Sequence, residues 1–513
     1  MTSLLLSIIV FLINGLSVLR FYQIKDYLLS RARAHFYLPS SKKLVLNPKE
    51  YLLYTLFLLS FFLNFFVDLT AFNYRVDFLV FLLIILFIWR FNFIKKIHFT
   101  IRTIVTILIQ FGLIFFIFWL TKNHLTIFIV LSLWTSQFIF FTFSNLIFQF
   151  VSKPYLLLLA KSVKKKLNQY SNLKIIGIVG SYGKSTTKEF FIQLLSKKYK
   201  VLSPPSRVNH ELALLRFILK ANLKNFDFLI IEFGSYYLGN IKWISKYITP
   251  QIAFITGITK QHLFLFGNIE NIIKGEGVEI LTWMKEGILF VNQNTEYFEK
   301  LIAEIKKEKK PNIKLYFYLP YEIESQDLEK TVFRFKNKIF ETKIIFPMQI
   351  ENLSGVLSYI SLIDNLDDYE DVIKNLELPD GFLKLKIKDN LYIFDDSYNA
   401  NPQGVFSSLN FFKKLNFDFK IIIFNGLFEL GKETERIYQE LSKELLNFDK
   451  IILTSDDYFR FFKNLLNDKV MIIKSQIELK ILLNNLNKSK IGIWVINRLP
   501  EKINYLLIKS STS

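Results

Sequence analysis

The sequence predicts an α-helical membrane domain followed by two α/β domains, and three observations support this prediction. The first third of the chain is apolar and basic, a phosphate-binding turn follows a strand near residue 180, and strands alternate with helical stretches from there onward. Of the 513 residues, 51% are hydrophobic, and the formal net charge is +21. This composition excludes a disordered chain and a purely soluble enzyme, and the absence of cysteine excludes disulfides, cysteine zinc sites and thiol nucleophiles.

The basic excess is concentrated in the apolar third. Residues 1–170 hold 18 Lys and Arg against four Asp and Glu, which supplies +14 of the total. Charge of this kind is more typical of membrane flanks than of a nucleic-acid-binding stripe, so we expect a lipid bilayer and no nucleic acid as partner. The segments expected to span, within a transmembrane domain of residues 1–152, are Thr2–Leu19, Tyr51–Val67, Phe78–Trp89, Thr103–Thr121 and Leu125–Ser152.

Charge placement predicts how these segments are oriented. The successive loops carry 0, 7, 1, 4, 1 and 5 basic residues, which predicts a multi-pass plasma-membrane protein with its N-terminus outside and the later domains in the cytoplasm. The short segment Phe78–Trp89 spans only if its flanking charges reach the interfaces, and a buried or re-entrant helix is the alternative. Residues 153–172 are expected to form a basic amphipathic linker on anionic lipid. A central domain at 173–378 and a C-terminal domain at 379–513 should follow.

The phosphate-binding turn begins where the predicted strand Lys174–Val179 ends. The turn reads Gly180-Ser181-Tyr182-Gly183-Lys184-Ser185-Thr186-Thr187 and opens a helix, so backbone N–H groups from Gly180 to Thr186 can cradle phosphates. Lys184 would neutralise the β- and γ-phosphates of a nucleotide, and the Ser185 hydroxyl would bind Mg²⁺. The strict pattern requires glycine where Ile178 stands, so an ordinary strand–helix turn is the alternative.

Further motifs follow in order. They are the loop Val208-Asn209-His210-Glu211, the strand end Glu232-Phe233-Gly234, the stretch from Pro250 to Ile272 around His262, the octapeptide DDSYNANP at Asp395–Pro402, and Glu429-Leu430-Gly431. With GSYGKSTT, this series resembles the Mur ligases, the ATP-dependent amide-forming enzymes of peptidoglycan precursor synthesis. The octapeptide and the ELG tripeptide resemble the branch of that family that adds D-alanyl-D-alanine.

The resemblance implies a fold and a reaction. The fold would be a P-loop central Mur-ligase domain with a smaller, Rossmann-like α/β domain at the C-terminus. The reaction would use ATP and Mg²⁺ to convert a muramoyl-peptide carboxylate into an acyl phosphate, from which an amino acid or dipeptide displaces phosphate. Such chemistry depends on positioning two anions and neutralising their charge.

The resemblance also assigns site residues. Catalysis would involve Lys184, Glu232, His262 and Glu276. One Mg²⁺ would be held by Ser185 and Glu232, and a second by His262 with Glu276. Nucleotide contacts would come from Asn352, Asp396 and Asn399 besides the P-loop. Substrate contacts would come from Asn209, His210, Glu211 and Arg498.

The sequence departs from the family pattern at several positions. Many relatives carry a carbamylated lysine where an ungapped alignment places Glu276, so we hypothesise that this carboxylate replaces the carbamate, with Glu279 as the register-shifted competitor. Gly381-Phe382 lacks the arginine of the family's GR, Asn425-Gly426-Leu427 replaces GDM, and Tyr438 replaces a histidine. These changes make the identity of the amine uncertain.

The front of the chain differs most, because residues 1–152 stand where a Mur ligase has its uridine-nucleotide-binding domain. The precursor would therefore be either UDP-linked, reaching another surface, or lipid-linked, arriving from the membrane plane. The leading prediction is a membrane-bound ligase of cell-wall precursor assembly. The alternatives are an ATP-hydrolysing membrane transport or signalling protein and an inactive ligase-like scaffold.

Overall fold

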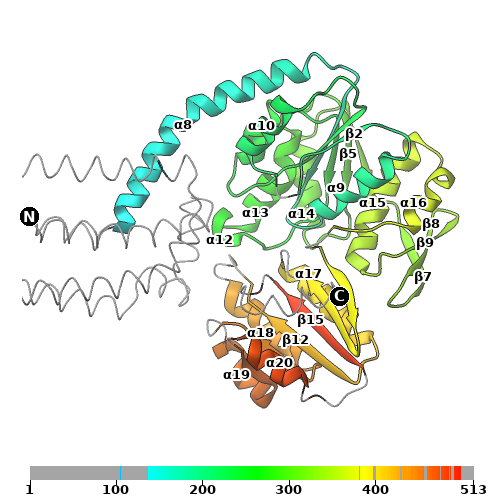
Figure 1. Ribbon diagram of the computed structural model, residues 1–513. Helices are drawn as coiled ribbons and strands as arrows, with labels where there is room; N and C mark the ends of the chain where they lie inside the picture. Colours follow the sequence, from blue (N-terminus) through cyan, green and yellow to red (C-terminus); the bar gives the residue numbers. More distant parts are fainter. Residues whose placement is uncertain are drawn as a thin grey trace, which may run out of the picture. The chain divides into compact units, whose positions relative to one another are not determined.

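The structure is a computed structural model that describes residues 104, 137–206, 208–379, 382–396, 400–427, 430, 433–455, 459–473, 475–484, 486, 490–497 and 499. The chain divides into two units, Met1–Leu156 and Leu157–Ser513. The second unit contains two α/β sheets with their helices (Figure 1).

The membrane part of the predicted fold class is wrong. Among the described residues, no helix is long and apolar enough to cross a membrane. Helix α8 (Gln137–Leu167) includes the end of the expected span Leu125–Ser152, but polar Gln149 and charged Lys153 interrupt its apolar run. Apart from residue 104, the other expected spans lie outside the described residues, as does the start of this one. The same finding overturns the predicted multi-pass placement in the plasma membrane with the N-terminus outside.

The basic segment 153–172 is helical as far as Leu167, and its lysines bond to backbone carbonyls of the domain that follows. The Lys166 Nζ donates to the carbonyl oxygens of Leu219, at 2.8 Å, and Ala221, at 2.6 Å. Both carbonyls lie at the C-terminal end of α10 (Glu211–Lys220), where a cation satisfies the last carbonyls of a helix and complements its dipole.

The central domain is built on a six-stranded parallel sheet in the order β2-β3-β1-β4-β5-β6. The strands read as almost uninterrupted apolar runs because helices cover both faces of a parallel sheet. Their bounds are β1 Lys174–Val179, β2 Val201–Leu202, β3 Phe228–Glu232, β4 Ile252–Ile255, β5 Gly287–Val291 and β6 Ile313–Phe317. The expected strand before the phosphate-binding turn is therefore confirmed as β1.

The helices of this domain are α9 (Lys184–Leu195), α10, α11 (Asn240–Ser245), α12 (Leu263–Phe266), α13 (Ile269–Ile272), α14 (Phe298–Glu308), α15 (Pro347–Ile363) and α16 (Glu370–Lys374), with a π-helical turn η2 (Ile273–Gly277) and 3₁₀ turns η3 (Val278–Leu281) and η4 (Leu366–Tyr369). Helices α9 to α14 lie between the parallel strands along the chain, whereas α15 and α16 follow β9 (Lys338–Thr342) and lead to the C-terminal domain. Helices α9 and α15 lie side by side over the sheet (Figure 1). Phe191 of α9 and Tyr359 of α15 make an edge-on aromatic contact between them, with ring centroids 5.9 Å apart. Phe191, Phe254, Phe290 and Tyr359 form the centre of this core.

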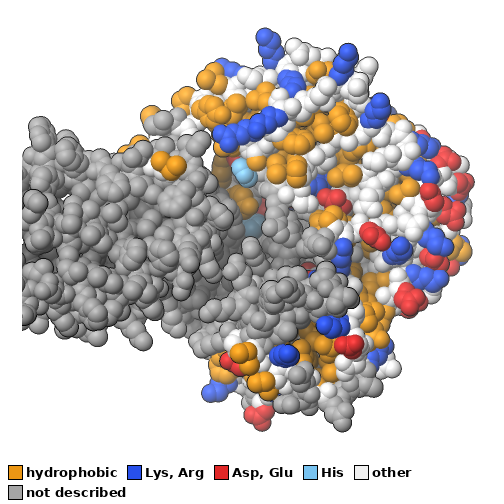
Figure 2. All heavy atoms as spheres, in the orientation of Figure 1, with side chains coloured by type: hydrophobic (Ala, Val, Ile, Leu, Met, Phe, Trp, Pro, Cys, Tyr) orange, Lys and Arg blue, Asp and Glu red, His pale blue; other side chains and the backbone are white. Residues whose placement is uncertain are grey.

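A separate antiparallel sheet of β7 (Tyr321–Gln326), β8 (Thr331–Phe335) and β9 (Lys338–Thr342) adjoins α16. Side chains of both charge signs gather over this part of the surface (Figure 2). Pairs such as Lys330 with Glu341, at 2.8 Å, are exposed to solvent on this face. Exposed ion pairs contribute little to stability.

The C-terminal domain contains the second six-stranded sheet, in the order β10-β11-β15-β12-β13-β14, in which only β10 runs antiparallel to its neighbour. The strands are β10 Lys384–Lys388, β11 Leu391–Asp396, β12 Phe419–Phe424, β13 Lys450–Leu453, β14 Val470–Ile472 and β15 Ile491–Ile496. The helices are α17 (Pro402–Lys414), α18 (Thr434–Leu445), α19 (Phe459–Leu466) and α20 (Gln476–Asn484), with the 3₁₀ turn η7 (Asn467–Lys469). The predicted α/β class of both domains is confirmed.

An aromatic contact joins the two α/β domains. Phe346, which precedes α15, packs edge-on against Phe394, Phe411 and the fully buried Trp494 of the C-terminal domain, with ring centroids 5.8 to 6.2 Å apart. Trp494 in turn stacks on Phe394 at 4.8 Å. This contact brings the start of α15 next to α17, at the cleft described below.

Candidate active site

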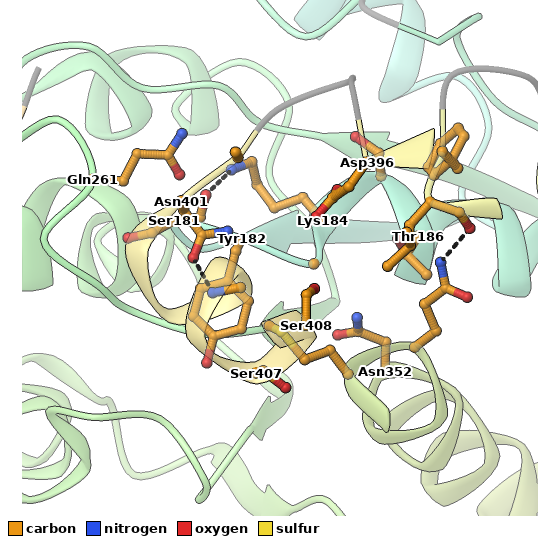
Figure 3. Close-up of a pocket in the computed structure, with 18 of the residues that line it drawn as sticks. Ser181, Tyr182, Lys184, Thr186, Gln261, Asn352, Asp396, Asn401, Ser407 and Ser408 are labelled. Carbon is orange, nitrogen blue, oxygen red and sulfur yellow. Dashed lines mark hydrogen bonds between the residues drawn. The ribbon is translucent and has the colours of Figure 1, made fainter. Parts of the chain in front are cut away.

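A cleft with a cavity volume of about 220 Å³ is lined by residues of both α/β domains. The central domain contributes the phosphate-binding turn, the loops after β3 and β4, the π-turn η2 and the start of α15. The C-terminal domain contributes Phe382, Leu383, Asp396 and several residues of α17 and the turn before it. Side chains from these segments converge on one space (Figure 3). Of the predicted site residues, the cleft is lined by Ser181, Tyr182, Gly183, Lys184, Ser185, Thr186, Asn209, Glu232, His262, Glu276, Asn352 and Asp396.

The backbone of the phosphate-binding turn requires its two glycines. Gly180 has φ +134° and Gly183 has φ +80°, a region that L side chains rarely adopt. A Cβ on Gly183 would also lie 2.6 Å from the Oδ1 of Asn352, so α15 approaches the turn closely at this point. Lys184 folds back over the turn, donating to the carbonyl oxygens of Gly180 and, at 3.3 Å, of Ser181. The ammonium therefore lies against the turn, beside the cleft.

Three polar side chains form a chain at the end of β3. The Ser185 hydroxyl donates to Oε2 of Glu232 at 2.8 Å, and the Asn209 amide donates to Oε1 at 2.9 Å. Glu232 is only 4% exposed, so both of its oxygens are oriented by protein donors. Serine and carboxylate oxygens side by side are the hard donors that Mg²⁺ prefers.

Glu276 reaches the same cleft from the π-turn η2 and is buried. Its carboxylate accepts a hydrogen bond from the hydroxyl of Ser181, which also accepts from the backbone N–H of Thr259 at 3.1 Å. The neighbouring Gly275 has no room for a side chain, because a Cβ there would lie 2.4 Å from the Phe266 ring. The π-turn therefore packs tightly and directs Glu276 at the phosphate-binding turn.

Glu279, the alternative to Glu276 in the alignment, contacts the backbone of α11 and not the phosphate-binding turn. Its carboxylate accepts from the backbone N–H of Gly239 and, at 3.0 Å, of Lys242, at the start of α11. Burial raises the pKa of Glu279. Glu279 does not line the cleft, whereas Glu276 does.

His262 adopts a left-handed backbone conformation, with φ +62°, just before α12. Non-glycine residues in this region are strained, and such strain gathers at functional sites. The imidazole lines the cleft and lies edge-on against Tyr236, with ring centroids 5.9 Å apart. Within the described part of the chain, no group of three or more His, Asp or Glu side chains is placed to hold a metal ion without further ligands. Glu232, His262 and Glu276 therefore share a cleft without forming a preformed metal cage.

The C-terminal domain contributes an acidic residue and a capped helix. Burial and the neighbouring Asp395 raise the pKa of Asp396 to about 7, while Asp395 itself pairs with Lys386 at 2.8 Å. Asn401 caps α17 by accepting from the backbone N–H of Gly404 at 2.9 Å. The octapeptide thus ends in the helix-starting turn that its Asn-Pro pair predicts.

Other predicted residues lie away from the cleft or beyond the description. His210 and Glu211 do not line the cleft; Glu211 accepts from the Tyr237 hydroxyl at 3.2 Å at the start of α10. Asn399, Gly381, Glu429 and Arg498 lie outside the described residues.

Two departures from the family pattern have structural roles. Phe382 lines the cleft where the family's arginine would follow Gly381. The buried Tyr438 hydroxyl accepts from the backbone N–H of Leu427 at 2.7 Å and so supports the loop after β12.

Sequence reasoning missed several lining residues, among them Tyr236, Gln261, Gln349, Ser407, Ser408 and Phe411. They come from loops and helix starts of both domains, and their types are common on any surface. Adjacency to a recognised motif, as for Tyr236 after Gly234 or Gln261 before His262, was the available signal.

Comparisons with known proteins give consistent results. Residues 178–356 match the family model described as the Mur ligase middle domain. The UDP-N-acetylmuramoyl-tripeptide–D-alanyl-D-alanine ligase of Borreliella burgdorferi is 28% identical over 320 residues, which cover 58% of this chain and 66% of that protein. The corresponding ligase of Rickettsia prowazekii is 26% identical over 312 residues, covering 58% and 69%. The chain thus spans about two thirds of the length of these relatives.

Solved structures share the fold. MurF from Acinetobacter baumannii superposes with a TM-score of 0.61 at 19% identity, covering 70% of this chain and 81% of that one. The MurF ligase from Thermotoga maritima in complex with ADP gives 0.60 at 21% identity, covering 69% and 84%.

Proposed function

We propose that this chain, which belongs to the Mur ligase family, is an ATP-dependent, ADP-forming ligase that joins an amine to a muramoyl-peptide carboxylate in peptidoglycan precursor synthesis. We assign D-alanyl-D-alanine as the amine, since the similar ligases are named for it and the DDSYNANP motif resembles their branch. The observation that carries the proposal is a single cleft in which the phosphate-binding turn faces Glu232, His262 and Glu276.

The reaction has two steps. In the first, a carboxylate oxygen of the precursor attacks the γ-phosphorus of ATP, the bond to the β,γ-bridging oxygen breaks, and ADP leaves. In the second, the amine nitrogen attacks the acyl carbon, the bond to the phosphate oxygen breaks, and the amine gives up a proton to water. Both steps bring anions together, so the protein contributes mainly position and positive charge.

Lys184 supplies the charge nearest the phosphates. Its ammonium bonds to carbonyls of the turn in the ligand-free structure, and a short swing of the side chain would transfer those bonds to phosphate oxygens. The backbone N–H groups of the turn and the start of α9 supply the remaining donors.

The donor set of the cleft suits Mg²⁺, which binds through one or two carboxylates and completes its shell with phosphates and water. We assign Ser185 and Glu232 to one ion, and His262 with Glu276 to a second. When bound, Mg²⁺ neutralises phosphate charge and polarises the acyl oxygen. The Asn209 amide, which donates to Oε1 of Glu232, would keep this carboxylate oriented toward the ion.

Glu276 is proposed to supply directly the anionic oxygens that carbamylated lysine supplies in many relatives. A glutamate is shorter, so its backbone must lie closer to the ligand. The π-turn at residues 273–277 supports this assignment, because it widens the helix locally and brings Glu276 to the Ser181 hydroxyl.

The nucleoside would lie toward the C-terminal domain. Asn352 abuts the phosphate-binding turn, Gln349 donates to the Leu383 carbonyl at 3.1 Å, and Asp396 faces them across the cleft. Residues from two domains would then enclose the nucleotide, and their closure would keep water from the acyl phosphate.

Phosphate release tests the proposal. Purified protein with ATP, Mg²⁺ and UDP-muramoyl-tripeptide should release phosphate when D-alanyl-D-alanine is added and yield the pentapeptide product by mass spectrometry. Lys184→Ala should abolish release. Phosphate release that does not depend on D-alanyl-D-alanine would indicate an ATPase of another kind. No phosphate release under any condition would indicate an inactive scaffold. Either result rejects the proposed ligase activity.

A further inference from the structure

A buried lysine that the proposed chemistry does not use lies in the second turn of α9. Lys188 is 2% exposed, although an ammonium is costly to bury without partners. Its Nζ donates to the carbonyl oxygen of Pro204 at 3.3 Å and lies 3.7 Å from the carboxylate of Glu189. Pro204 belongs to the loop between β2 and α10, which also contains Asn209.

This loop is attached to the cleft at its other end. Asn209 donates to Glu232 through its amide, and its backbone carbonyl accepts from the N–H of Gly234 at 2.9 Å. A Cβ on Gly234 would lie 3.1 Å from the Asn209 carbonyl oxygen, so a glycine at this position lets the loop approach closely. Glu232 then bonds to Ser185, one turn before Lys188 on the same helix.

These contacts form a closed ring. Helix α9 holds the loop directly at Pro204, through Lys188, and more weakly at Ser206, whose hydroxyl donates to Glu189 at 3.5 Å. It also holds the loop indirectly through Ser185, Glu232 and Asn209. We infer that Lys188 is a positioning residue: by fixing the loop at Pro204, it sets where the Asn209 amide meets Glu232 and thereby orients the carboxylate assigned to Mg²⁺. Only the phosphate-release measurement described below depends on the proposed function, because the position of the loop can be measured without enzyme activity.

The geometry distinguishes this role from plain core packing. A methionine would fill nearly the same volume as Lys188 but could not donate to Pro204. Loss of one buried, charge-assisted hydrogen bond should free the loop while leaving the helix folded. The effect should reach the cleft through Asn209 alone, so removing Asn209 should remove the effect.

A double-mutant cycle tests this. The variants are Lys188→Met, Asn209→Ala and the pair, with Lys197→Met, an exposed lysine just past α9, as matched control. Hydrogen exchange at the backbone amides of Ser203, Ser206, Val208 and Asn209 in ligand-free protein is the first readout, since Pro204 and Pro205 have no N–H. The Mg²⁺ concentration for half-maximal phosphate release is the second. Lys188→Met should speed exchange and raise that concentration, each about tenfold, and Lys197→Met should change neither.

In the Asn209→Ala background, Lys188→Met should shift the Mg²⁺ requirement less than twofold. Additive effects, or unchanged exchange in Lys188→Met, would overturn the inference. Should Lys188→Met fail to fold, Lys188→Gln, which keeps a polar side chain but is too short to reach Pro204, takes its place in the same cycle. A wild-type protein that releases no phosphate would reject the ligase, while the exchange comparison would still decide whether Lys188 fixes the loop.

Discussion

Lys260 of the central domain and Glu433 of the C-terminal domain form an ion pair with Nζ and Oε2 2.8 Å apart. Lys260 lies two residues before His262, and Glu433 immediately precedes α18, where it also accepts from Arg436 at 2.8 Å. The hydrogen bonds from Lys260 and Arg436 lower the pKa of Glu433. Besides the aromatic contact at Phe346, this pair joins the two domains close to the cleft.

Breaking the pair should weaken domain closure modestly. Lys260 and Glu433 are half-buried, so solvent still screens the pair and it is worth on the order of 1 kcal/mol. Lys260→Met should therefore lower kcat/KM for ATP by about fivefold, with the gap closing at high salt. Steady-state kinetics at low and high ionic strength measure this. Lys330→Met, which breaks an exposed pair just before β8, should have no effect. A salt-independent loss larger than fiftyfold would show that Lys260 acts in the chemistry itself.

The raised pKa of Asp396 predicts a pH-dependent stability difference. In the unfolded chain an aspartate ionises near 3.8, whereas in the folded protein Asp396 ionises near 7, so ionisation penalises the folded state increasingly between these values. Asp396→Asn cannot ionise, and its Tm relative to wild type should therefore rise as the pH goes from 4 to 7 and level off above. Thermal melts across that range test this, and a flat difference would mean that Asp396 ionises normally.

Local patterns predicted the parts of the site that depend on short stretches of chain. The glycines, Lys184 and Ser185 follow a buried strand, and this arrangement is set by neighbouring residues. The choice between Glu276 and Glu279 was harder to predict from the sequence. A π-turn shifts the register between residues 272 and 279, and no local sequence rule signals such a turn. Lining residues such as Gln349 and Phe411 come together only through packing between domains.

The membrane prediction failed for a physical reason that α8 illustrates. The predicted spans are stretches free of charge, but uncharged polar residues such as Asn145 and Gln149 also cost free energy when they are buried in hydrocarbon. In α8 these residues, with Lys153, leave no apolar stretch long enough to cross a membrane. The remaining expected segments lie outside the described residues.

The close approach of Gly183 to Asn352 predicts a rescue experiment. Gly183→Ala should lower the Tm, because alanine in a left-handed conformation costs about 1–2 kcal/mol and its Cβ would meet Oδ1 of Asn352 at 2.6 Å. Adding Asn352→Ala should recover the steric part of the loss. Gly239→Ala is the control, since φ there is +93° but nothing lies within 4 Å of its Cβ. Equal Tm losses for the two glycine variants would refute the predicted clash.

Glu276 provides the most direct test of the catalytic assignment. Glu276→Gln keeps the size of the side chain and removes the negative charge, so kcat should fall about 100-fold while ADP binding, which depends on the phosphate-binding turn, stays within about threefold. Stopped assays of product formation and calorimetric titration with ADP measure the two quantities. Because the carboxylate is encoded directly, wild-type activity should also be unchanged in buffer freed of carbon dioxide and bicarbonate.

Glu279→Gln separates this role from burial alone, since both glutamates are buried and lie three residues apart. The Glu279 carboxylate accepts hydrogen bonds from two backbone N–H groups at the start of α11. Glu279→Gln should therefore lower the Tm by a few degrees and lower kcat only weakly. If instead Glu279→Gln abolishes turnover and Glu276→Gln does not, the π-turn holds a structural glutamate. The anionic ligand would then have to come from elsewhere in the cleft.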